Sequence, residues 1–195
     1  MTQQLAYLSR PARTVPDDVE EPSGIPAGAV SLPADRLKDL FRGHPGGVAV
    51  ITADAGDGPV ALTATSVSSV SVDPPLLVFS ISSLSSASAT LERADAVVVH
   101  LLDAEDLEIA KLGATSGIDR FADGSRWTRL ETGEPVFTDV RAWVRCVVVE
   151  RMQAGSSTVI AAHGVESRVR PGADDGALVY HKRTWHRLGA HSRLG

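Results

Sequence analysis

Residues 48–63 read VAVITADAGDGPVALT, and this stretch decides how the chain begins to fold. Two runs rich in β-branched residues, 48–52 and 60–63, flank the turn sequence Gly-Asp-Gly-Pro at 56–59. Glycine and proline suit the backbone angles of tight turns, and β-branched side chains favour extended strands. The stretch therefore predicts an antiparallel β-hairpin.

More strands of the same kind follow along the chain. Apolar or alternating runs predict them at 67–72, 76–81, 96–102, 140–152, 158–169 and 177–180. The expected helices are few and short: 33–41 with Ser31 as its N-cap, 87–94, and 103–112 with an acidic first turn. Because strands do not alternate with long helices, a doubly wound parallel sheet is excluded, and an antiparallel barrel or sandwich is predicted.

One folded domain is expected, with extensions at both ends. The chain has 195 residues, of which 43% are hydrophobic, so it can bury a core of its own. Residues 1–30 hold four prolines, two charge clusters and no sustained apolar period, which predicts a flexible extension or an arm across a partner. The domain is placed at 31–190, with a tail at 191–195.

Composition also excludes several function classes. A net charge of -5 argues against nucleic-acid binding, which usually needs a basic face. No apolar run is long enough to span a membrane, and the first residues do not resemble a signal peptide. A single cysteine, Cys146, excludes an internal disulfide and favours the cytoplasm, where it is expected to be a small buried residue.

Searches for common catalytic patterns find nothing specific. His181 and His186 are the nearest approach to a metal site, and a pair of this kind is too few for one, so no metal is predicted. No Gly-x-Ser-x-Gly pentad marks a serine nucleophile. We therefore assign no catalytic side chain.

Serine and threonine are concentrated between residues 63 and 90, where they make up 13 of 28 residues. In one interpretation they form the solvated face of an antiparallel sheet. In the other, the loop at Thr65 and Ser66 and the turn at 82–86 supply hydroxyls and backbone N–H groups that enclose a phosphate without a lysine. Periodicity alone leaves both open.

Several segments resemble the flavin reductase family of FMN-binding split barrels. They are GVAVIT at 47–52, LTATSVSSVSVDPPL at 62–76, AVVVHLL at 96–102, DRFA at 119–122, AWVRC at 142–146 and VYHKRTWHRLG at 179–189. Their order and spacing are similar to the family's from about residue 34 to residue 189. The resemblance implies a mainly β, antiparallel, Greek-key-like split barrel with a few short flanking helices.

The resemblance also implies a function. A flavin reductase takes hydride from NADH or NADPH, reduces FMN or FAD, and supplies the reduced flavin to a flavin-dependent monooxygenase, acting as a cytoplasmic homodimer. The flavin does the redox chemistry, and the protein orients the two rings.

Site residues are carried over from the matching segments. Those implied to bind flavin are Thr65, Ser66, Ser82, Ser85, Ser86, Phe121 and His181, with Tyr180 as an alternative to His181. Those implied to meet the nicotinamide substrate are Asp119, Arg120 and His163. Alternatives remain open: Phe121 as a buried anchor, His163 as a solvated strand residue, and residues 180–186 as an edge strand with packed aromatics.

Two departures from the family pattern bear on the function. Many relatives carry an Asp-His pair after the hairpin glycine, where this chain has Gly155-Ser-Ser-Thr158. The segment 85–91 also lacks the usual threonine and tryptophan. The alternatives are therefore a flavin-binding electron carrier without its own NAD(P)H reductase activity, or a split barrel that holds another ligand such as a deazaflavin.

Overall fold

The computed structural model describes residues 29–171 and 176–194, and the prediction of an extension at 1–30 falls almost wholly outside them. Three helices and two 3-10 turns are present: α1 (Ala34–Arg42), α2 (Ser88–Arg93), η1 (Ala104–Asp106), α3 (Leu107–Ala114) and η2 (Ala190–Ser192). The first six strands are β1 (Gly46–Gly47), β2 (Ala49–Ala53), β3 (Val60–Ala64), β4 (Ser68–Val72), β5 (Pro75–Ser82) and β6 (Ala96–Leu101). The others are β7 (Trp127–Arg129), β8 (Pro135–Phe137), β9 (Ala142–Ala154), β10 (Ser157–Val169), β11 (Leu178–His181) and β12 (Thr184–Arg187).

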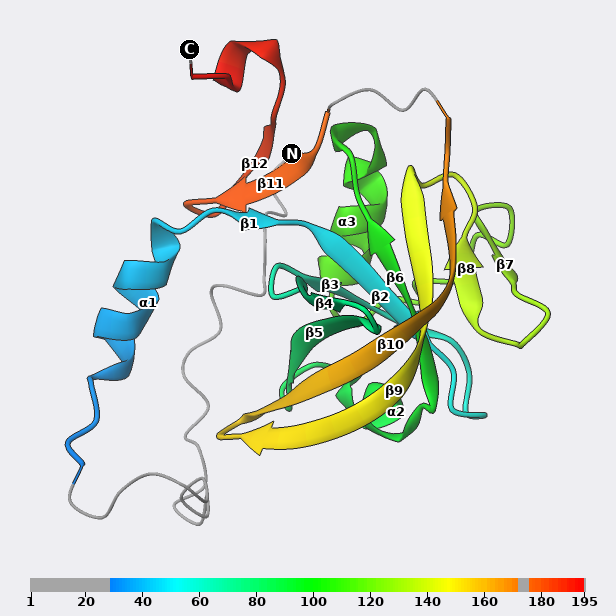
Figure 1. Ribbon diagram of the computed structural model, residues 1–195, viewed down its shortest axis with the longest axis horizontal. Coiled ribbons are helices and arrows are strands. Elements are labelled where there is room, and N and C mark those ends of the chain that lie inside the picture. The colour runs from blue at the N-terminus through cyan, green and yellow to red at the C-terminus, as the bar shows by residue number, and fades with distance from the viewer. Residues whose placement is uncertain (1–28, 172–175, 195) are drawn as a thin grey trace.

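Seven strands form one antiparallel sheet in the order β3-β2-β6-β9-β10-β5-β4 (Figure 1). A three-stranded sheet, β1-β11-β12, and the β7-β8 hairpin complete the fold. The hairpin predicted from residues 48–63 is confirmed, because Ala53 pairs with Val60 and Ala49 with Ala64. The predicted pairing of 67–72 with 76–81 is confirmed as β4-β5.

Two apolar clusters lie on opposite faces of β2 and β6. Successive side chains of a strand point to opposite faces, so Ile51 and Val99 enter one cluster while Val50 and Val98 enter the other. All five residues of β2 are buried. This explains why the first strand of the deciding stretch is almost continuously apolar instead of alternating.

Helix α3 packs closely on β3 at a glycine. A Cβ added to Gly113 would lie 2.4 Å from Thr63 Oγ1. Thr63 in turn donates its hydroxyl to the Ala110 carbonyl oxygen at 2.7 Å. The loop that follows α3 is thereby brought to the end of β3.

The predicted helix at 103–112 is divided into η1 and α3. The carboxylate of Asp106 accepts a hydrogen bond from the Asp103 backbone N–H at 2.9 Å, which stabilises the acidic start. At α1 the prediction of a Ser31 cap was wrong, because the helix begins after Pro33 and no side chain caps it. Cys146 is buried, as expected.

Two strands beyond Gly113 were not predicted: β7 and β8. Each has only three residues, which is too short for a period of two to be recognised. The strand β12 agrees with the alternative of an edge strand at 180–186. An ion pair joins the β7-β8 hairpin to the main sheet, since Arg129 Nη2 lies 2.6 Å from Asp54 Oδ2. The carboxylate of Glu134, beside β8, lies 2.6 Å from Arg145 Nη2 on β9.

Candidate functional site

The Ser66 hydroxyl fastens the end of β3 to β5. It accepts the Ser80 backbone N–H at 3.0 Å and donates to the Ser80 carbonyl oxygen at 3.2 Å. Ser66 and its neighbour Thr65 are both exposed. Since Ser80 precedes Ser82 by two residues on β5, this link brings the loop at 65–66 to the same end of β5 as the serine-rich turn.

The turn at 82–86 presents hydroxyls that keep a proton to donate. Ser82 Oγ accepts the Leu84 N–H at 3.3 Å, and Ser85 Oγ accepts the Ala87 N–H at 3.2 Å. A hydroxyl that accepts one bond still has its own O–H. The turn therefore offers donors to an acceptor such as phosphate.

Arg120 lies against this turn, and no carboxylate among the described residues forms an ion pair with it. Its guanidinium donates to the Thr115 carbonyl oxygen at 2.7 Å and lies 3.4 Å from Ser86 Oγ. Its Nε atom is buried and has no hydrogen-bond partner among the described residues. Burial lowers the pKa of Arg120 from its usual range, and no carboxylate opposes that effect. A half-buried cation beside serine hydroxyls is an anion-binding arrangement.

The turn between β9 and β10 also reaches this region. Gly155 has a positive φ of 62°, and the Ser156 carbonyl oxygen accepts the Ser83 N–H at 3.0 Å. The segment that departs from the family pattern therefore contacts the serine-rich turn directly.

Phe121 is a core residue in this structure. Its ring stacks on Phe137 with centroids 5.6 Å apart and meets Trp127 edge-on at 4.9 Å. Only 7% of Phe121 is exposed. The single chain therefore buries the ring, which agrees with the alternative of a buried anchor, and stacking of Phe121 on the flavin stays a prediction. Asp119 accepts the Phe121 N–H at 2.9 Å and so fixes the backbone that carries Arg120.

His163, carried over from the family, lies away from the serine-rich turn. His163 pairs with Leu76, whereas Ser82 pairs with Ser157, so His163 is six residues along β10. That separation is about 20 Å. His181, on β11, is partly buried, and its ring lies 5.7 Å from that of His186.

Thr65 lies closer to the β1-β11-β12 sheet. A Cβ at Gly46 would lie 2.8 Å from Thr65 Cβ, and Gly46 pairs with Tyr180 on β11. Tyr180 packs on Trp185 with centroids 4.6 Å apart. The structure thus brings Thr65 near Tyr180 through β1, and residues 180–186 form strands with packed aromatics, as one alternative had it.

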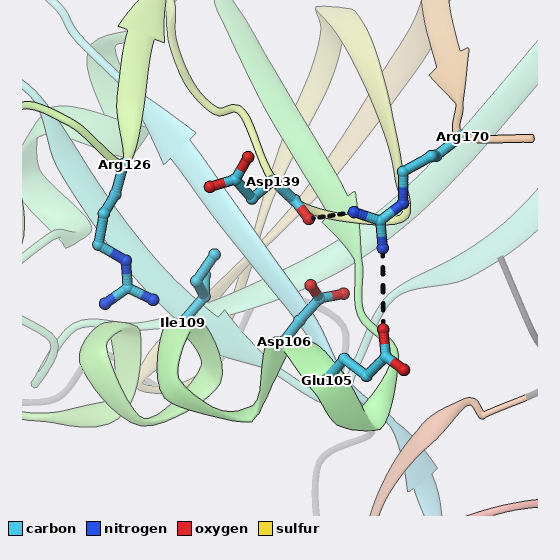
Figure 2. A pocket seen from close by; sticks show the side chains of 6 residues that line it. All are labelled: Glu105, Asp106, Ile109, Arg126, Asp139 and Arg170. Carbon is cyan, nitrogen blue, oxygen red and sulfur yellow. Dashed lines mark hydrogen bonds and ion pairs between the residues drawn. The ribbon is translucent and has the colours of Figure 1, made fainter.

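Two hollows lie elsewhere on the described part of the chain. Figure 2 shows one of about 150 Å³, into which Arg126 points, and where Arg170 bonds the Asp139 carbonyl oxygen at 3.0 Å. The other, about 520 Å³, is lined by charged residues including Asp54, Arg129 and Arg145. None of the predicted site residues lines either of these two hollows.

Two hydrogen-bond partners in the site could not be predicted from the sequence. The backbone of Ser80 holds Ser66, and the carbonyl of Thr115 holds Arg120. Among the described residues, no group of three or more histidine, cysteine or acidic side chains could hold a metal ion. No described helix has the length and apolar character needed to cross a membrane.

Comparison with known proteins identifies the family. Residues 41–189 match the family model of the flavin reductase like domain. An NADH:FMN oxidoreductase of Rhodococcus qingshengii is 38% identical over 180 residues, covering 90% of this chain and 92% of that protein. A second relative, the FMN reductase (NADH) RutF 1 of Methylorubrum extorquens, is 34% identical over 171 residues, covering 87% and 83%.

Solved structures show the same fold. A flavin reductase domain protein from an Arthrobacter species superposes with a TM-score of 0.74 at 30% identity, covering 80% of this chain and 95% of that one. The flavin reductase component of a bacterial two-component tryptophan halogenase gives 0.71 at 27% identity, covering 80% and 98%. The predicted fold and family are therefore confirmed: the chain belongs to the flavin reductases, a family of oxidoreductases.

Proposed function

We propose that this flavin reductase uses NADH to reduce FMN and that it holds the flavin phosphate between Arg120 and the turn at 82–86. The observation that carries the proposal is the half-buried Arg120 guanidinium, which pairs with no carboxylate of residues 29–171 and 176–194 and lies 3.4 Å from Ser86 Oγ. The choice of NADH and FMN is supported by relatives named NADH:FMN oxidoreductase and FMN reductase (NADH). FAD and NADPH are the alternatives that the assay below distinguishes.

The described residues fit a flavin phosphate. Ser82, Ser85 and Ser86 offer hydroxyl donors, and Arg120 offers a positive charge that lacks a counter-ion. Thr65 and Ser66 are exposed beside this turn, where they would contact polar edges of the flavin. A serine-lined phosphate site with one arginine needs no lysine.

The chain contributes orientation to the reaction, and the bound flavin supplies the redox chemistry. Arg120 and the serines would hold one end of the flavin, and the Ser66–Ser80 link would hold β3 and β5 at a fixed spacing beneath it. The rate of hydride transfer depends on how closely the two rings are aligned. Loss of one hydroxyl should therefore weaken flavin binding more than it lowers turnover.

The protein is proposed to be a cytoplasmic homodimer that passes reduced flavin to a monooxygenase. A halogenase reductase component and a nitrilotriacetate monooxygenase component B are among the proteins that share its fold. His181 and Tyr180 are proposed to line the flavin pocket near Thr65, and Asp119 is proposed to face the nicotinamide.

The flavin carrier remains the second candidate because of one observation. The hairpin that departs from the family's Asp-His pattern contacts the proposed phosphate turn, through the Ser83–Ser156 hydrogen bond. The position where relatives place an Asp-His pair therefore lies at the site and lacks the histidine. His163 does not take the place of the missing histidine, because it lies about 20 Å along β10 from the serine-rich turn.

Anaerobic bleaching of FMN, and separately of FAD, by NADH and by NADPH tests the activity. Rapid reduction over many turnovers by catalytic amounts of protein supports a reductase and names both substrates. Flavin binding without reduction by either nucleotide would establish the carrier instead.

The phosphate site is tested by comparing FMN with riboflavin, which lacks the phosphate. Arg120→Ala should weaken FMN binding about 10- to 100-fold, as expected for loss of hydrogen bonds from a charged group. Riboflavin binding should stay unchanged, and Arg120→Lys should restore part of the FMN affinity. Arg126→Ala is the matched control, because Arg126 points into the separate hollow of Figure 2. Equal losses for FMN and riboflavin would reject the site.

A further inference from the structure

Thr158 buries a hydroxyl group between β10 and α2. Only 6% of the residue is exposed, and its side chain lies on the same face of β10 as the core residue Ile160. The hydroxyl has one proton, and Glu92 Oε1 at 2.9 Å is a closer acceptor than Gln153 Oε1 at 3.3 Å. Because leaving a buried polar group without a partner is costly, the bond to Glu92 holds the last turn of α2 against β10.

A second hydrogen bond attaches the same part of the chain to the β9–β10 hairpin. The Ser83 N–H donates to the Ser156 carbonyl oxygen at 3.0 Å. Ser83 and Glu92 are nine positions apart in the sequence, whereas their partners Ser156 and Thr158 are only two positions apart. The segment 83–92 is therefore held at both ends by one short hairpin, beside which α2 lies in Figure 1.

The segment 83–92 contains two serines of the proposed phosphate site, Ser85 and Ser86. Arg120 lies 3.4 Å from Ser86 Oγ. Ser88, the first residue of α2, donates its hydroxyl to the Ser85 carbonyl oxygen at 2.8 Å, so the turn and the helix move together. A displacement of α2 would therefore change the position of both serines relative to Arg120.

Helix α2 has further attachments besides the one to Thr158. Thr90 Oγ1 lies 3.2 Å from Asp57 Oδ2, and Arg93 forms an ion pair with the same carboxylate. Arg151 on β9 donates to the Ala94 carbonyl oxygen, just beyond the helix, at 2.6 Å. Loss of the Thr158 bond should therefore leave α2 folded and change only how precisely it is placed on β10.

We propose that Thr158 and Glu92 are positioning residues for the flavin phosphate, because their hydrogen bond holds α2 on β10 and so keeps Ser85 and Ser86 within reach of Arg120. Neither side chain contacts the flavin in this role. The inference rests on the phosphate site of the proposed function and adds the residues that fix its shape. Loss of the bond should weaken contacts to the phosphate and leave contacts to the flavin ring unchanged.

Binding of FMN and of riboflavin, which lacks the phosphate, tests the role of Thr158. Thr158→Val replaces the hydroxyl with a methyl group and should raise the Kd for FMN about three- to tenfold, the effect of one hydrogen bond, with riboflavin binding unchanged. Turnover at saturating FMN should also stay unchanged. Thr158→Ser keeps the hydroxyl and should restore the affinity for FMN.

Thr90→Val is the matched control. Thr90 is also 6% exposed, and its hydroxyl also bonds a carboxylate, but that carboxylate belongs to Asp57 in the turn between β2 and β3. Since Arg93 still pairs with Asp57 in this variant, α2 keeps the attachment and the Kd for FMN should not change. An equal rise in the Kd for FMN in Thr90→Val and Thr158→Val would overturn the inference, because general loosening of α2 would then explain both.

Glu92→Ala supplies the second measurement at an exposed residue, where folding should not be affected. It should raise the Kd for FMN as much as Thr158→Val does. The double variant should bind FMN no more weakly than either single variant, because both substitutions remove the same hydrogen bond. Losses that multiply in the double variant would show two independent roles and overturn the inference.

Arg120→Ala, measured on the same ligands, separates this inference from the proposed function. A selective loss of FMN binding in Arg120→Ala, with none in Thr158→Val or Glu92→Ala, overturns the positioning role and leaves the phosphate site standing. Equal losses of FMN and riboflavin binding in Arg120→Ala would reject the phosphate site and the positioning role together.

Discussion

His100 should make the stability of this protein depend on pH in a way that can be calculated. The ring is fully buried, and its Nδ1 lies 2.9 Å from the Val50 carbonyl oxygen. The Phe137 N–H donates to Nε2 at 3.0 Å. These partners require a neutral ring with the proton on Nδ1, because Nε2 must accept.

Burial lowers the pKa of His100 to about 4 from the ordinary value of 6.5, and the bond to Val50 opposes the shift. Below pH 6.5 the ring of His100 is therefore protonated in the unfolded chain but stays neutral in the native protein until the pH approaches 4. The stabilising contribution is complete above pH 6.5 and is lost as the pH falls toward 4. The full loss is about 3 kcal/mol, of which about 2 kcal/mol falls between pH 7 and pH 5.

Denaturant unfolding at pH 7 and pH 5 measures this contribution of His100 to the free energy of unfolding. His100→Gln does not titrate, so the free energy of unfolding of wild type should fall by about 2 kcal/mol more than that of the variant over this interval. The pH-independent change in unfolding free energy that the substitution causes is the same at both pH values, so it cancels in this comparison. His44→Gln, at an exposed histidine, should show the wild-type dependence.

An equal pH dependence in wild type and His100→Gln would refute the reasoning. If the variant does not fold, the ring can be observed by NMR in the wild-type protein. A His100 signal that is still neutral at pH 5 agrees with the calculation, and one that titrates near pH 6.5 contradicts it.

Further substitutions test the packing of the chain at three positions. Arg145→Met should lower the free energy of unfolding by about 3 kcal/mol, because the Glu134 carboxylate, which is only 8% exposed, loses its counter-charge. Adding Glu134→Gln to this variant should restore most of the loss, measured in the same denaturant titration. Gly113→Ala should cost about 1 to 3 kcal/mol, since the new Cβ meets Thr63 Oγ1, and a further Thr63→Ala should relieve it. Phe121→Ala should lower the free energy of unfolding by about 3 to 5 kcal/mol. Phe121→Leu should leave the Kd for FMN within about threefold of wild type. A much larger change in Kd would indicate that the ring contacts the flavin.

Much of the fold could be predicted from residues close in sequence. The 48–63 hairpin and the β4-β5 pair were found because β-branched runs and turn residues act over a few positions. The family was found because several such segments occur in order. The strands β7 and β8 were missed, since three residues carry too little pattern.

The candidate site was likewise predicted only in part from the sequence. The concentration of serine and threonine between residues 63 and 90 marked the turn at 82–86, and hydroxyl chemistry alone made it a phosphate candidate. The sequence could not place Arg120 beside Ser86, because that contact joins residues 34 positions apart through the packing of α3 on β3. It also could not choose between a stacking and a buried Phe121, since both suit an aromatic in a loop.

The sequence by itself determined the fold class, the family and the residue types available to bind a phosphate. These follow from local conformational preference and from the chemistry of side chains, which need no neighbour to be defined. Only the tertiary structure decided which serines meet the arginine and that His100 is held neutral between Val50 and Phe137. Those outcomes depend on burial and on contacts across the sheet, and neither is set by the residues adjacent in the chain.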